Sequence, residues 1–158
     1  MAKLGIYSIW FYSNNPNQKT KRVAVALRKN IDFQLIDTLT DQEGRFILIK
    51  GLLYHTLCTI GSIYLPNKNQ NRTLSQIAHK IKEFGEGILI IGGDINLPIN
   101  PPQDTSKGYS TIPYPKLKKG LKIIQSLRLI DTWRFMNPTT KQFSHYPPPP
   151  PPKTAMLD

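Results

Sequence analysis

Short runs of hydrophobic residues fill the first part of the chain. The clearest are Val23–Leu27, Phe33–Ile36, Arg45–Lys50 and Thr56–Tyr64, and an earlier apolar stretch covers Leu4–Tyr12. Short runs rich in β-branched and aromatic residues, bounded by turn-forming residues, are typical of β-strands. Because the connections between them are short, the pattern predicts antiparallel neighbours in a meander.

The hydrophobic spacing then changes to a helical period. Apolar residues recur at Leu74, Ile77, Ala78, Ile81 and Phe84. This spacing predicts a helix with Thr73 as its N-cap and Gly85 just past its end. A second helix is predicted to begin near Pro115. Its buried face would consist of Leu117, Leu121, Ile124 and Leu127.

The remaining segments complete the predicted fold. Ile88–Ile91 is apolar on both faces, which predicts a strand in the middle of a covered sheet. Leu129–Trp133 predicts a return of the chain to the core, and Phe143–Tyr146 predicts a last strand. The six prolines of Pro147–Pro152 can form only polyproline II or an irregular arm. The sequence thus predicts an α/β domain over residues 1–146 and a proline-rich tail over residues 147–158.

Composition and charge narrow the class of partner. The chain has 158 residues and is 39% hydrophobic, which is enough for the packed core of one domain. It carries 21 Lys and Arg against 10 Asp and Glu, so its formal net charge is +11. This excess favours an anionic partner, with nucleic acid ahead of a membrane surface.

Part of the positive charge is concentrated in the second predicted helix. Five cations and no acid occupy 116–128, namely Lys116, Lys118, Lys119, Lys122 and Arg128. This segment is either a solvated helix face or a surface that binds phosphates. Lys107 lies in a preceding polar loop that could also contact DNA.

Cysteine content and hydrophobic run length indicate the compartment. Cys58 is the single cysteine, which excludes an intramolecular disulfide framework and a cysteine-based zinc site and suggests a reducing environment. No apolar run approaches the roughly 18 residues of a membrane helix. The turn at Asn14–Asn17 favours a strand over a secretory signal at the N-terminus. We therefore expect a nuclear or cytoplasmic protein, neither secreted nor in a membrane, with a monomer favoured.

The segment Gly92–Pro98 is the most informative for chemistry. A hydrophobic strand ends in two glycines, which let another group approach the backbone closely, and Asp94 and Asn96 follow. Residues two apart in an extended chain project to the same side. Asp94 could hold a water or a metal ion, and Asn96 could bind a phosphate oxygen without adding negative charge. The alternative is a strand end closed by an Asx-turn.

A second polar group follows the preceding strand. Tyr64 ends that strand, and Asn67 comes after a proline that stiffens the turn. Both side chains are neutral donors suited to phosphate oxygens. Taken alone, this segment is better explained as an ordinary surface turn.

In their order along the chain, these segments resemble the endonuclease/exonuclease/phosphatase superfamily. The resemblance is greatest to the endonuclease domain of LINE-type retrotransposon polyproteins, which is related to exonuclease III and the apurinic endonucleases. The matching segments are Lys19–Val25, Asp41–Phe46, Ile63–Asn67, Gly93–Pro98 and Leu129–Trp133. The resemblance covers Trp10 to Tyr146 and implies a two-sheet α/β sandwich, with sheets face to face, helices outside, and both ends incomplete.

The resemblance also implies an activity, namely metal-dependent hydrolysis of DNA phosphodiesters with Mg²⁺ or Mn²⁺. By this likeness Asp94 would position or activate the attacking water and bind the metal, and Asn96 would hold the scissile phosphate. Tyr64 and Asn67 would contact the phosphate or support the transition state. In-line attack on a phosphodiester needs a base, neutral donors and a cation to balance the developing charge, which agrees with this set.

The chain also departs from the family pattern. An upstream metal-binding glutamate and a C-terminal histidine have no counterpart, so the chain resembles a truncated copy that we expect to be weakly active or inactive alone. Glu43 matches a structural turn, and structural roles are predicted for His55, His79 and His145. The alternatives are a non-catalytic nucleic-acid-binding remnant, an interaction protein whose proline tail docks in an aromatic groove, and a phosphatase of lipid or nucleotide phosphates.

Overall fold

The structure is a computed structural model that describes residues 8–14, 22–105 and 108–141. These residues divide into two compact units. The first unit holds the described parts of 1–97 together with 112–130, and the second holds those of 98–111 and 131–158. No helix among the described residues is long and apolar enough to cross a membrane.

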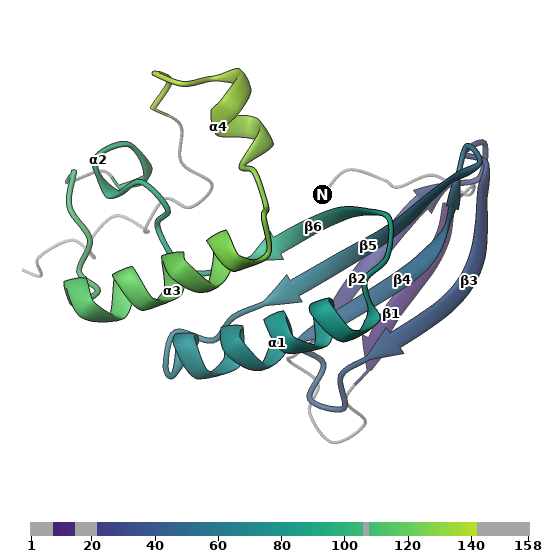
Figure 1. Cartoon of the computed structure of the whole chain (residues 1–158), viewed down its shortest axis with the longest axis horizontal. Helices are drawn as coiled ribbons and strands as arrows, with labels where there is room; N and C mark the ends of the chain where they lie inside the picture. The colour runs from purple at the N-terminus through teal and green to yellow at the C-terminus, as the bar shows by residue number, and fades with distance from the viewer. Residues whose placement is uncertain (1–7, 15–21, 106–107, 142–158) are drawn as a thin grey trace, which may run out of the picture. The chain divides into compact units, whose positions relative to one another are not determined.

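The strands of the first unit form two sheets within the described residues. β1 (Ser8–Asn14) pairs antiparallel with β2 (Arg22–Arg28). The larger sheet has the order β3-β4-β5-β6, with β3 (Phe33–Thr40), β4 (Phe46–Leu53), β5 (Thr56–Tyr64) and β6 (Ile88–Asp94). β3, β4 and β5 are consecutive antiparallel neighbours, which confirms the predicted meander for these three strands. The strand predicted at Val23–Leu27 pairs instead with β1 in the other sheet. β6 instead runs parallel to β5 (Figure 1).

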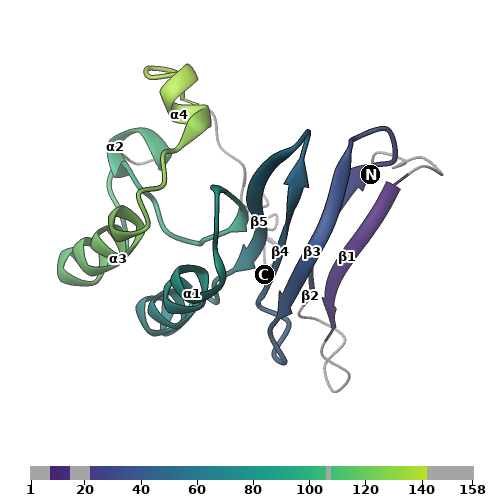
Figure 2. The same cartoon turned by 45° about the vertical axis from the view of Figure 1, so that its right-hand side comes forward.

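The two sheets pack face to face. Val23 and Val25 of β2 form one buried cluster with Ile47 and Ile49 of β4. At the turn before β4, the Ser13 hydroxyl of β1 donates a hydrogen bond to the Asp41 carbonyl at 2.7 Å. The predicted α/β arrangement with two sheets is therefore confirmed (Figure 2).

The helix α1 (Gln70–Phe84) covers the other face of the larger sheet. Leu74, Ile77 and Ile81 are buried against a cluster that includes Leu48 and Ile63, as the helical spacing predicts. The prediction of Thr73 as N-cap was wrong. The N-cap is Asn69, in the left-handed region at φ 58°, and Thr73 is buried within the first turns. Gly85 follows the helix end, as predicted.

The helix α3 (Tyr114–Ser126) lies beside α1 and runs parallel to it (Figure 1). Near the helix starts, the Asn71 amide donates to the Lys116 carbonyl at 2.8 Å, and near the ends Lys82 Nζ donates to Ser126 Oγ at 3.1 Å. Gly120 permits this close packing, because a Cβ there would lie 2.9 Å from the Asn71 amide oxygen.

The buried face of α3 is the predicted one. Leu117 is buried, and three half-buried side chains pack against the same core, namely Leu121, Ile124 and Leu127.

The position of β6 differs from the prediction. Among the described strands β6 is at the edge of its sheet, and Ile88 and Ile90 are 57% and 44% exposed. Leu89 and Ile91 point to the opposite face and pack against the helix-side core. The interpretation of β6 as a covered central strand was therefore wrong, because β1 and β2 pack on β4 and β5.

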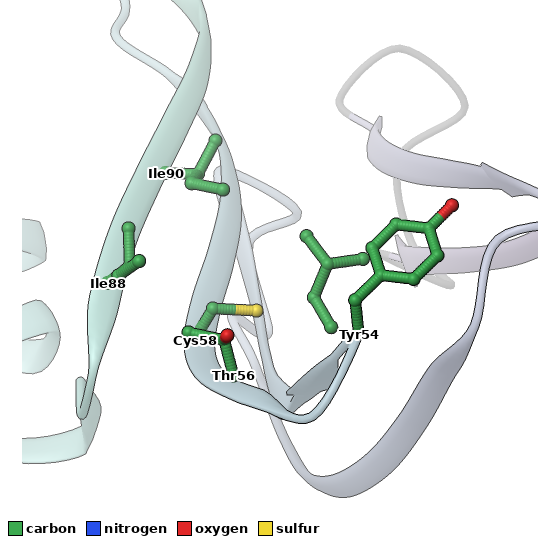
Figure 3. Close-up of a pocket in the computed structure, with 6 residues that line it drawn as sticks. Tyr54, Thr56, Cys58, Ile88 and Ile90 are labelled. Atoms are coloured by element: carbon green, nitrogen blue, oxygen red, sulfur yellow. The ribbon is translucent and has the colours of Figure 1, made fainter.

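A shallow hollow of about 250 Å³ marks this exposed face. Figure 3 shows Ile88 and Ile90 on one side of it and Tyr54 on the other. Cys58 of β5 lies between them and is buried.

The second unit contains the short helices α2 (Pro101–Asp104) and α4 (Thr132–Met136). The Arg134 guanidinium pairs with Asp104 at 2.8 Å and donates to the Thr140 carbonyl at 2.8 Å, which ties the two helices together.

Leu129–Trp133 does not return to the core as predicted. Ile130 is 73% exposed and Trp133 is 39% exposed. Asp131 instead caps α4, with its carboxylate accepting from the Arg134 N–H at 2.9 Å. The predicted strand Phe143–Tyr146 and the tail 147–158 lie outside the described residues.

Candidate functional site

The parallel strands β5 and β6 end side by side, and their ends carry the residues that the sequence singles out. Tyr64 stands opposite Asp94 in the strand register. One residue further along, the Leu65 N–H donates to the Asp94 carbonyl at 2.8 Å. Open α/β sheets bind ligands at the carboxyl ends of parallel strands, so this edge is the candidate site.

Gly93 allows the two strands to close at this point. Its φ is +125°, and a Cβ there would lie 1.9 Å from the Ile63 carbonyl oxygen. The predicted close backbone approach is therefore confirmed for Gly93. At Gly92 a Cβ would meet nothing within 4 Å, so the two glycines are not equivalent.

Asp94 and Asn96 form a local turn at the end of β6. Asp94 Oδ1 accepts from the Asn96 N–H at 3.1 Å, which is the Asx-turn that the sequence offered as an alternative. Asn96 has φ 45°, in the left-handed region that asparagine tolerates. Asp94 is exposed, and its Oδ2 has no hydrogen-bond partner among the described residues. The turn therefore leaves this carboxylate oxygen available to a ligand.

The Asn96 side chain ties the two strand ends together. Its Nδ2 donates to the Leu65 carbonyl at 2.7 Å, and Gln70 Nε2 donates to the Asn96 carbonyl at 2.6 Å. Within the described part of the chain, the Asn96 amide oxygen and its second amide hydrogen have no partner. One amide hydrogen of the Asn96 side chain thus stabilises the fold, and the other is left to donate to a phosphate oxygen.

Gln70 is a site residue that the sequence analysis missed. It opens α1 and fixes the backbone of Asn96 from the helix side. The apolar period of this helix begins only at Leu74, so the hydrophobic pattern carries no signal for Gln70. The polar run after Pro66 was the available indication.

Tyr64 and Asn67 occupy different environments. Tyr64 is half-buried and packs against the cluster between the two sheets. Asn67 is exposed, and its side chain makes no hydrogen bond with any described residue. The structure therefore brings Tyr64 to Asp94 through the strand register and leaves Asn67 on the neighbouring loop.

Two replacements of Asn96 should separate the contribution of its side-chain hydrogen bond from that of its left-handed backbone conformation. We expect Asn96→Ala to lower the free energy of unfolding by about 2 kcal/mol, from the lost hydrogen bond and the left-handed backbone. Asn96→Gly keeps that backbone accessible and should cost about 1 kcal/mol. Urea denaturation of both variants checks this, and equal midpoints for the two would exclude a backbone contribution.

The donor set bears on the expected metal ion. Among the described residues no group of three His, Cys, Asp or Glu side chains could enclose a metal. Mg²⁺ often keeps several waters and is held by one or two carboxylates plus substrate phosphates. Asp94 Oδ2 fits that mode as a single protein ligand, so binding is expected to be weak without a phosphate substrate.

The other predicted residues lie outside this edge. Four predicted DNA contacts are exposed on α3, namely Lys116, Lys118, Lys119 and Lys122. Lys107 and His145 fall outside the described residues. His55 lies 3.9 Å from Asp32, and His79 lies 3.1 Å from Glu83 one helical turn away.

No family model matches the chain. Solved structures of TDP2, an endonuclease/exonuclease/phosphatase superfamily member, are partially similar to it. TDP2 of D. rerio, complexed with a single-strand DNA product, has 20% sequence identity and TM-score 0.47, over 59% of this chain and 40% of that chain. A humanized D. rerio TDP2 with 14 mutations has 19% sequence identity and TM-score 0.45, over 59% of this chain and 41% of that chain. A truncated Caenorhabditis elegans TDP2 has 16% sequence identity and TM-score 0.42, over 68% of this chain and 45% of that chain. The match thus spans less than half of each TDP2 chain.

Proposed function

We propose that the edge formed by β5 and β6 is a phosphodiester-hydrolysing site that acts on DNA with Mg²⁺ or Mn²⁺. The observation that carries the proposal is that Tyr64 lies opposite Asp94 in the strand register. Beside them, Asn96 has one amide hydrogen that no described residue accepts. The order of the motifs along the sequence further supports kinship with LINE-type endonuclease domains. By the same proposal the protein acts where DNA is accessible, in the nucleus or cytoplasm.

Each residue of the edge has a role that its environment supports. The free Oδ2 of Asp94 would accept a proton from the attacking water or orient it. The second amide hydrogen of Asn96 would hold a non-bridging phosphate oxygen, with its direction fixed by the bond to Leu65. Tyr64 and Asn67 would add neutral donors. A bound divalent cation would supply charge neutralisation at the phosphate.

Mn²⁺ offers a test that does not depend on turnover. In a ¹⁵N-labelled sample with a short oligonucleotide, paramagnetic broadening should be centred on the amides of Leu65, Asp94 and Asn96 and should weaken with distance from them. It should disappear in Asp94→Asn. Broadening centred on other carboxylates, such as Asp32 or Asp37, would overturn the assignment.

Nicking of supercoiled plasmid tests the chemistry itself. Because no group of three His, Cys, Asp or Glu side chains among the described residues could enclose a metal ion, we expect slow nicking. It should be measurable with protein in excess over plasmid and should stop on addition of a chelator. An absence of nicking under these conditions would contradict the proposal.

One observation favours a second candidate, a non-catalytic nucleic-acid-binding function. No group of three His, Cys, Asp or Glu among the described residues could hold a metal ion, while the four α3 lysines are all exposed. DNA binding without nicking, in the presence of either metal, would select this alternative.

A further inference from the structure

Positive charge is concentrated on the two parallel helices. Residues 70–84 and 114–128 together carry eight cations and one acid, Glu83. The cations are Arg72, Lys80, Lys82, Lys116, Lys118, Lys119, Lys122 and Arg128. The strand region 22–64 carries five cations and four acids, so it is nearly neutral. The helix layer therefore accounts for most of the net charge of +11.

These cations form one surface, called here the α1–α3 surface. All eight residues are exposed, because the apolar sides of both helices are buried against the sheet. Hydrogen bonds between the helices at both ends hold them side by side, as Figure 1 shows. Charges from two separate stretches of sequence are thereby brought into one layer.

The single acid does not interrupt the surface. Lys80 Nζ contacts Glu83 at 2.9 Å and His79 lies 3.1 Å from it, all within α1. The hydrogen bond from Lys80 holds the pKa of the Glu83 carboxyl below its usual range. Arg72, Lys119 and Lys122 have no acidic partner among the described residues. The surface thus keeps a large excess of unpaired positive charge.

We propose that the α1–α3 surface binds the phosphate backbone of nucleic acid without reading its sequence. The helix α3 has 13 residues. At about 1.5 Å per residue it spans roughly 20 Å, over which one DNA strand presents about six phosphates. Other exposed residues of the two helices can donate hydrogen bonds to phosphate oxygens, namely Ser75, Gln76, His79, Gln125 and Ser126.

The same composition disfavours an anionic membrane as the partner. Helices that lie in a lipid interface insert an exposed apolar face into it. The apolar faces of α1 and α3 are already packed on the sheet. The exposed residues of the two helices are polar or charged except Tyr114 and Pro115 at the start of α3. Binding to a polyanion by charge alone therefore fits this surface better than lipid insertion.

The proposal goes beyond the hydrolytic site and does not depend on it. The surface uses no residue of the Tyr64–Asp94 edge. The starts of both helices do lie toward that edge, because Gln70 opens α1 and binds the Asn96 carbonyl. Nucleic acid on the surface could therefore extend to Asp94, but binding alone requires only the cations.

Fluorescence anisotropy tests the proposal. The binding constant K is measured for two 20-base-pair duplexes of unrelated sequence at several salt concentrations. Each phosphate contact contributes about −0.9 to the slope of log K against log salt. Arg72→Gln/Lys119→Gln should reduce the magnitude of the slope by about 1.8, equally for both duplexes. The matched control Arg28→Gln/Lys29→Gln removes the same charge from an exposed strand end and should leave the slope unchanged.

Circular dichroism should show that both double variants keep the wild-type melting temperature. Asp94→Asn should bind with the wild-type slope, so a failure of hydrolysis would leave this proposal standing. An equal reduction of the salt slope in Arg28→Gln/Lys29→Gln would overturn the proposal for the α1–α3 surface. An absence of DNA binding at 50 mM salt would also overturn it. Binding to phosphatidylserine vesicles in the absence of DNA binding would also overturn it.

Discussion

Gly93→Ala should lower the free energy of unfolding by about 3 kcal/mol or more. Its φ of +125° is strained for alanine, and the added Cβ would fall 1.9 Å from the Ile63 carbonyl oxygen. That atom belongs to the backbone of β5, so relief requires the parallel strands to separate. The loss is large because the clash and the strained dihedral act at the same residue.

Gly92→Ala is the matched control for this prediction. Gly92 lies in the same strand, and a Cβ there would meet nothing within 4 Å. Its stability should stay within about 0.5 kcal/mol of the wild type. Thermal and guanidinium unfolding of the two variants make the comparison. Similar losses at both positions would show that the approach of Ile63 to Gly93 is not the cause.

Asp94→Asn should reduce plasmid nicking about 10²- to 10⁴-fold, the usual range for loss of a general base. The substitution keeps the side-chain shape, and the amide oxygen can still accept from the Asn96 N–H. What is lost is the charge and basicity of the exposed Oδ2. The turn should therefore survive, and the effect should be confined to the chemical step and metal affinity.

Asp37→Asn provides the control for charge. Asp37 lies on β3, at the opposite edge of the same sheet, and its replacement raises the net charge by the same amount. Single-turnover rates with excess protein should be unchanged in this variant. Equal rates for wild type and Asp94→Asn would show that another group supports the reaction.

The elements with a clear buried face were predictable from sequence. The meander β3–β5 and the helices α1 and α3 follow from their apolar periods, because burial on one side determines those periods. The exposed edge position of β6 was not predictable. A run that is apolar on both faces says nothing about how many strands lie beyond it, and here Ile88 and Ile90 remain exposed.

Local polar structure was harder to foresee than the core. The start of α1 depends on Asn69 in the left-handed region, and the three residues after it carry no apolar period. Ile130 and Trp133 suggested burial by their hydrophobicity, yet Asp131 uses its carboxylate to start α4. A left-handed backbone conformation decides the first case and a side chain to backbone hydrogen bond decides the second, and a hydrophobic pattern shows neither.

In the candidate site, too, some residues could be predicted from the sequence and others could not. Asp94 and Asn96 could be proposed from their spacing after a hydrophobic strand, whereas Gln70 reaches Asn96 only through the crossover between parallel strands. The cations of α1 were likewise missed. Arg72 and Lys82 join the α3 lysines because the two helices pack side by side, which no local sequence pattern states.

The burial of Cys58 gives the chain an internal reporter of local opening on the exposed face of the larger sheet. Cys58 stands opposite Ile88 in the β5–β6 register, and it is the single cysteine of the sequence. Burial raises the pKa of its thiol, which further suppresses the reactive thiolate. Alkylation of the native protein should therefore be slow and should require movement of the residues that cover the thiol, among them Ile88 and Tyr54. The labelling rate would then measure how often this cover opens, at one native residue and without an introduced cysteine.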